Sequence, residues 1–135
     1  MKKLLLGMAV MLASLTSTHA RGIKVDCGIP AGNIVFERMS ADTVYVHQDL
    51  RDTRGDWFYW AFRVTGAEGR TLKFQFDKKY WAAVGSRGAA VSTDRGASWR
   101  WSDEIDPSAA KDELGDHADV RGFAYAFGPN DKEVW

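Results

Sequence analysis

Apolar residues recur at every second position over much of this chain, which is the spacing of β-strands with one buried face. In residues 71–77, Leu72, Phe74 and Phe76 alternate with polar side chains. Residues 57–65 follow the same period, with Phe58, Trp60, Phe62 and Val64 on the apolar face. Shorter runs of this kind predict further strands at 33–39, 43–47, 89–93, 98–101, 121–127 and 133–135.

Turn-forming residues separate these strands. Residues 66–69 join the two strongest strands, 94–96 join two shorter ones, and similar groups occur at 40–42 and 129–131. Many short strands divided in this way predict an all-β fold, an antiparallel β-sandwich of jelly-roll type, and not a parallel α/β fold. Because no repeat or linker interrupts the pattern, we expect a single domain over residues 21–135.

One acidic segment departs from the strand pattern. Residues 103–119 hold seven acids and one lysine. Asp106 suits a helix N-cap and Pro107 the first helical position, so 108–114 could form a short helix that ends at Gly115. The acids could also bind Ca²⁺, although an EF-hand spacing is absent, and a solvated acidic loop is the preferred interpretation. The oxygen ligands considered are those of Asp112, Glu113, Asp116 and Asp119.

The first 20 residues have the pattern of an export signal. Lys2 and Lys3 precede an apolar run at 4–15, and residues 18–20 (Thr-His-Ala) form a suitable cleavage site. The run is shorter than the roughly 20 residues of a membrane span. We therefore expect a signal peptide at 1–20 and an exported protein, periplasmic or extracellular, with an uncleaved anchor as the alternative.

Charge and cysteine content narrow the functional classes. Lys and Arg together number 18, as do Asp and Glu, and removal of two signal lysines gives 16 minus 18, or −2. This balance argues against nucleic acid or an anionic membrane as the partner. Cys27 is the single cysteine, so it cannot form an internal disulfide and either packs as a small residue or pairs between chains.

The chain lacks a recognisable catalytic constellation. Two histidines, His47 and His117, remain after the signal peptide, and neither belongs to a zinc-ligand pattern. No serine lies in a Gly-x-Ser-x-Gly elbow, and Cys27 has no obvious partner base. We therefore expect no enzyme activity, metal or cofactor in this chain alone.

Residues 92–99 have a more specific pattern, Ser-x-Asp-x-Gly-x-Ser-Trp, which resembles the Asp-box hairpin of sialidases and related β-proteins. In such a hairpin Asp94 accepts hydrogen bonds from turn amides, Gly96 takes a positive φ and Trp99 packs beneath. Together with Ser92, these residues are predicted to be structural and not catalytic.

Aromatic residues make up 13% of the chain, with six tryptophans. Most occupy the apolar faces of predicted strands and are expected in the core. Trp57 and Tyr59 lie on the opposite face of their strand beside Arg63, a combination typical of interfaces and ligand platforms. A second packed sheet would account for them equally well.

In order, the aromatic strand at 56–64, the strand at 71–76, the hairpin at 91–101 and the strands at 123–127 and 133–135 resemble the N-terminal domain of cytosolic-carboxypeptidase-like zinc peptidases. The resemblance implies a non-catalytic antiparallel β-sandwich that precedes and packs on an α/β peptidase domain. It also implies that the zinc ligands and the catalytic Glu belong to that second domain, which would begin where this sequence stops. The export signal departs from the family's cytosolic name.

The sequence therefore predicts a secreted accessory module, truncated or stand-alone, that supports or flanks a carboxypeptidase domain. Its expected partner is that catalytic domain or a peptide substrate. The alternative is a carbohydrate- or peptide-binding β-sandwich, because aromatic platforms suit sugar rings.

Overall fold

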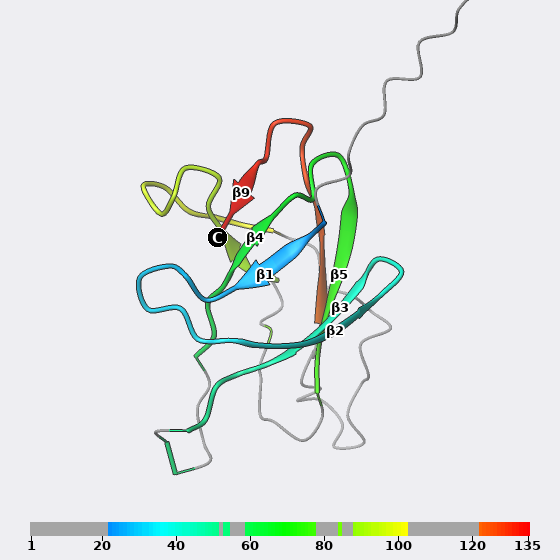
Figure 1. Ribbon diagram of the computed structural model, residues 1–135. Helices are drawn as coiled ribbons and strands as arrows, with labels where there is room; N and C mark the ends of the chain where they lie inside the picture. The colour runs from blue at the N-terminus through cyan, green and yellow to red at the C-terminus, as the bar shows by residue number, and fades with distance from the viewer. Residues whose placement is uncertain (1–21, 52, 55–58, 78–83, 85–87, 103–121) are drawn as a thin grey trace, which may run out of the picture.

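The computed structural model describes residues 22–51, 53–54, 59–77, 84, 88–102 and 122–135 (Figure 1). Within these ranges the chain forms strands and no helix, as the alternating sequence predicts. The strands are β1 (Lys24–Asp26), β2 (Val35–Ser40), β3 (Thr43–His47), β4 (Arg63–Thr65), β5 (Thr71–Phe76), β6 (Ala90–Val91), β7 (Arg100–Trp101), β8 (Gly122–Ala126) and β9 (Glu133–Val134). The predicted signal peptide and the predicted helix at 108–114 lie outside the described residues.

The strands are arranged in three hydrogen-bonded sheets. One has the order β2-β3-β5-β8, another β1-β4-β9, and β6 pairs with β7. The prediction of a wholly antiparallel fold is wrong at one pair, because β3 and β5 run parallel, with Val44 opposite Phe74 and Val46 opposite Phe76. The reason is the turn at 66–69, where Gly66 and Gly69 have positive φ and the chain passes from β4 in one sheet to β5 in another instead of forming a hairpin.

Of the predicted strand at 57–65, the structure describes residues 59–65. Only Arg63–Thr65 is in β4, and upstream of it Asn33 and Ala61 form an isolated bridge. The Asn33 side-chain amide donates to the Tyr59 carbonyl at 3.1 Å, and the Tyr59 hydroxyl donates to the Ala31 carbonyl at 2.8 Å. Side chains thus satisfy backbone groups that a longer strand would have paired with a neighbouring strand.

The buried faces follow the sequence pattern closely. In β5, Leu72, Phe74 and Phe76 are buried while Thr71 and Lys73 are exposed. The core extends across sheets, since buried residues of β3, β5 and β8 pack with Phe62, Val64 and Val134 in one cluster. The apolar alternation therefore identified the core face of each of these elements.

Short pairings define the region that holds the site. β6 and β7 contain two residues each, fewer than predicted, and the pairing continues where the Ser102 amide donates to the Ala89 carbonyl at 2.8 Å. Ser92 and Trp135 exchange two backbone hydrogen bonds of 2.9 Å, which join the end of β9 to the end of β6. β1 was missed from the sequence because three residues are too few to display a period of two.

Candidate functional site

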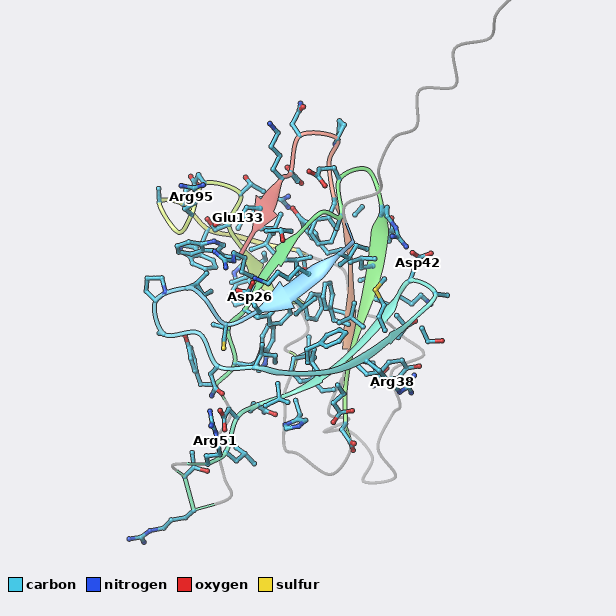
Figure 2. The ribbon with its side chains drawn as sticks, in the orientation of Figure 1. Asp26, Arg38, Asp42, Arg51, Arg95 and Glu133 are labelled. Atoms are coloured by element: carbon cyan, nitrogen blue, oxygen red, sulfur yellow. The ribbon has the colours of Figure 1, made fainter. Side chains whose placement is uncertain are left out.

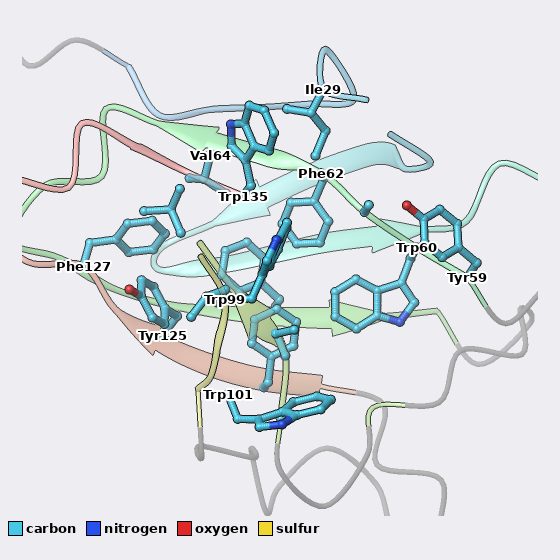
Figure 3. Close-up of a pocket in the computed structure, with 18 residues that line it drawn as sticks. Ile29, Tyr59, Trp60, Phe62, Val64, Trp99, Trp101, Tyr125, Phe127 and Trp135 are labelled. Carbon is cyan, nitrogen blue, oxygen red and sulfur yellow. The ribbon is translucent and has the colours of Figure 1, made fainter. Parts of the chain in front are cut away.

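An aromatic cleft of about 490 Å³ lies among β4, β5, β6, β7, β8 and β9 (Figure 3). Eighteen described residues line it, and ten of these are aromatic. The ten are Tyr59, Trp60, Phe62, Phe74, Trp99, Trp101, Phe123, Tyr125, Phe127 and Trp135. A volume of this size lies within the range of roughly 300–1,000 Å³ found for ligand pockets in proteins.

Stacked core rings form part of the cleft wall. Phe74 of β5 stacks on Phe123 of β8 with ring centroids 4.9 Å apart, and Trp60 stacks on Phe123 at 5.6 Å. Phe62 packs against Phe74 at 5.3 Å. Because these rings also hold two sheets together, this part of the wall is built by the core itself and has a fixed shape.

Three large aromatic side chains stand exposed at the rim. Tyr59 is 43% exposed, Trp99 53% and Trp101 44%. Small residues of β6 and its approach, Gly88, Ala89 and Ala90, line the cleft near the two tryptophans. Large exposed aromatic groups beside a hollow are typical of binding surfaces.

The turn that precedes β7 is fixed by a dense set of hydrogen bonds. Asp94 accepts from the Ser98 amide at 2.9 Å and from the Ser92 hydroxyl at 2.7 Å, and it also accepts from the Ser98 hydroxyl. The hydrogen bonds from Ser98 and Ser92 lower the pKa of Asp94 to about 2. Gly96 has a φ of 83°, so the turn hydrogen bonds of Asp94 and the positive φ expected at Gly96 are both present.

Trp99 contacts this turn but is not covered by it. It remains more than half exposed, and its indole nitrogen donates to the Gly96 carbonyl at 3.1 Å. The ring of Trp135 also lies against Gly96, at 3.0 Å from the point where a Cβ would stand, and the ring of Trp99 lies 3.6 Å from the same point. Both indole rings thus contact the turn at Gly96, and Trp99 also lies at the rim of the cleft.

Most polar atoms of these aromatic side chains already have partners within the protein. The Trp135 indole donates to Glu133 at 2.7 Å, Trp99 donates to Gly96, and the Tyr59 hydroxyl donates to Ala31. Glu133 also lies 3.7 Å from Arg95, which Figure 2 shows beside it. The cleft therefore presents mainly ring faces and edges, with few hydrogen-bonding groups for a ligand.

Of the three predicted interface residues, Tyr59 and Arg63 lie within the described residues. Tyr59 is at the cleft rim, whereas Arg63 does not line the cleft and pairs with Asp26 of β1 at 2.9 Å. Burial acts to raise the pKa of Asp26, but Lys24, Arg63 and the Gly28 amide together lower it to about 2. Trp57 lies outside the described residues.

Only some of the remaining predicted sites lie within the described residues. Cys27 is exposed and unpaired. His117 and the acids considered for Ca²⁺ lie outside the described residues, and within the described ranges no group of three His, Cys, Asp or Glu side chains could hold a metal ion. The described part of the chain also contains no helix long and apolar enough to cross a membrane.

Sequence reasoning missed Trp101 and Trp135 as site residues. The signal that could have found Trp101 is its spacing from Trp99, which puts two tryptophans on one face of a short strand. Trp135 gave no such signal, because its place beside Gly96 depends on the pairing of β9 with the end of β6.

Comparison with known proteins adds no relative. A scan against protein-family models, a search of curated proteins and a search of solved structures each found no match. The resemblance to the N-terminal domain of zinc carboxypeptidases thus remains a hypothesis that rests on the sequence segments named above.

Proposed function

We propose that this chain is a non-catalytic, exported binding module whose aromatic cleft receives apolar side chains of a polypeptide partner. The observation that carries the proposal is the cleft itself, with ten aromatic residues in its lining and three of them exposed at the rim. Tyr and Trp are enriched at protein interfaces because their rings bury much area with little loss of conformational freedom.

The choice of polypeptide over carbohydrate follows from hydrogen bonding. Sugar sites place aromatic rings beside groups that bond hydroxyls, and a polar ligand group left without a partner costs about 1–3 kcal/mol. In this cleft the hydrogen-bond donors of Tyr59, Trp99 and Trp135 are used by Ala31, Gly96 and Glu133. An apolar side chain needs none of these atoms and gains from leaving water.

The fold we propose for the module is a two-layer sandwich. The reciprocal bonds between Ser92 and Trp135 would continue the sheet β1-β4-β9 into β6-β7, and β2-β3-β5-β8 would form the opposite layer. Contact between Phe62 and Phe74 supports this, because it joins the two proposed layers. Export is inferred from the signal-like pattern of residues 1–20 alone.

The family resemblance suggests which polypeptide the partner is. It makes the catalytic domain of a zinc carboxypeptidase, or a peptide substrate of one, the expected partner, with this chain in a supporting role. The exposed rings of Tyr59, Trp99 and Trp101 favour a protein surface, because a rim of this kind is buried by a partner more effectively than by a small ligand. Carbohydrate binding is the competing function.

The experiment is a titration of the purified protein followed by tryptophan fluorescence. The probe is a blocked neutral peptide, acetyl-Gly-Gln-Phe-Leu-Gln-Gly-amide, compared with maltohexaose and cellohexaose. We expect saturable binding of the peptide alone and at least tenfold weaker binding by Trp101→Ala, equivalent to about 1.4 kcal/mol.

Phe36→Ala is the matched control, because Phe36 is 45% exposed, nearly the same as Trp101, but does not line the cleft. It should bind the peptide as the wild type does. Saturable binding of a glycan with no response to the peptide would overturn the proposal in favour of carbohydrate recognition.

A further inference from the structure

Arg100 does not itself line the cleft, but it contacts a residue that does. An Nη of Arg100 donates to the hydroxyl of Tyr125, a cleft-lining residue, at 2.8 Å. The guanidinium carbon is 5.5 Å from the centre of the Tyr125 ring. Arg100 is exposed, and this bond uses one of its five N–H donors.

The carboxylates of the surrounding turns already have partners. Asp94 accepts from Ser98 and Ser92, Glu133 accepts from Trp135, and Asp131 accepts from the Gly128 amide at 2.8 Å. None of the ion pairs formed by the described side chains includes Arg100. Its charge is thus without a carboxylate partner in this part of the chain.

Tyr125 lies between opposing charges. Burial is the main reason that the pKa of Tyr125 is raised; Arg100 lowers this pKa and Asp131 raises it further. Asp131 is therefore the negative charge that opposes the effect of Arg100 on the Tyr125 hydroxyl. It does so without forming an ion pair with the guanidinium, whose remaining donors stay available to a ligand.

We propose that the polypeptide segment bound at the cleft is acidic: an Asp or Glu next to its apolar anchor pairs with Arg100. This inference rests on the proposed function and names the chemistry of its partner. A guanidinium can bind a carboxylate through two parallel hydrogen bonds. Such a pair selects acidic segments over neutral ones.

The test compares two blocked peptides that differ only in charge, Gly-Glu-Phe-Leu-Glu-Gly and Gly-Gln-Phe-Leu-Gln-Gly, by isothermal titration calorimetry. The wild type should bind the acidic peptide at least tenfold more tightly, and this preference should shrink as salt rises. Arg100→Gln should abolish the preference, so that the acidic and the neutral peptide bind with equal affinity. Arg100→Lys keeps the charge but cannot form two parallel hydrogen bonds with a carboxylate, so it should retain part of the preference for the acidic peptide.

Arg38→Gln is the control for net charge. Arg38 is exposed, stacks over Tyr45 at 3.5 Å and lies away from the cleft, so its loss should leave the preference intact. The melting temperature of each variant shows whether it is folded. If Arg100→Gln does not fold, the salt dependence of binding by the wild type still tests the inference.

The outcomes separate the two proposals. Equal affinity of the wild type for both peptides, or an equal effect of Arg38→Gln and Arg100→Gln, would overturn the acidic partner while leaving cleft binding in place. Binding of neither peptide would overturn the proposed function as well. Tighter binding of 4-phenylbutyrate than of the acidic peptide would overturn the polypeptide partner in favour of a small acid.

Discussion

Truncation of Phe76 tests the assignment of the buried face of β5. Phe76 is 1% exposed at the end of β5, does not line the cleft, and packs on Trp60 with ring centroids 5.0 Å apart. Phe76→Ala removes the ring and leaves a cavity, because its neighbours on β3 and β5 are held by sheet hydrogen bonds.

The expected cost combines two contributions. Removing a buried phenyl ring sacrifices about 1.5–3 kcal/mol of transfer free energy, and the cavity and the lost contact with Trp60 bring the total to about 3–5 kcal/mol. For a domain of this size each kcal/mol lowers the melting temperature by roughly 4 °C, so we expect a fall of roughly 12–20 °C.

The assay is urea denaturation and thermal unfolding, followed by circular dichroism. Lys73→Ala is the control, because Lys73 lies on the same strand but is exposed, and its removal should cost well under ~1 kcal/mol. Melting temperatures that fall equally for the two variants would refute the assignment of faces in β5.

Three further predictions concern the turn and the cleft. Gly96→Ala should destabilise the hairpin by about 1–2 kcal/mol, because φ is 83° and the new Cβ would meet the Trp135 ring; an unchanged melting temperature would contradict this. Since the pKa of Asp94 is lowered from 3.8 to about 2, its stabilisation should be complete above pH 4 and lost as the pH falls through 2. Asp94→Asn should flatten this dependence of stability on pH. Slower amide exchange at Ser98 in the variant than in the wild type would contradict the stabilising role of Asp94. Ala90→Leu places a larger side chain at an exposed position that lines the cleft. It should weaken peptide binding about tenfold with little change in melting temperature. Unaltered affinity would show that the peptide does not occupy the part of the cleft next to Ala90.

The sequence identified the core because burial follows the period of two in β3, β5 and β8. Phe74 and Phe76 were placed on the correct face from alternation alone, since that pattern depends on local geometry. The parallel pairing of β3 with β5 could not be predicted in this way. It depends on where the turn after Thr65 directs the chain, and several directions are compatible with the same local residues.

The candidate site was only partly accessible to sequence reasoning. Tyr59 was singled out, but Arg63, grouped with it by alternation, is held by Asp26 of β1, a strand too short to be recognised. The cleft requires Trp135, which is far from Trp99 in the sequence, to contact the same turn as Trp99. Contacts of this kind arise from tertiary packing, which no local periodicity encodes.

The most direct test of cleft binding compares Trp101→Ala with Phe36→Ala in a calorimetric titration of the blocked acidic peptide. These two side chains are almost equally exposed, at 44% and 45%, and differ in that only Trp101 lines the cleft. We predict at least tenfold weaker binding for Trp101→Ala and wild-type affinity for Phe36→Ala. Equal affinities for the two variants, with both folded, would contradict the account.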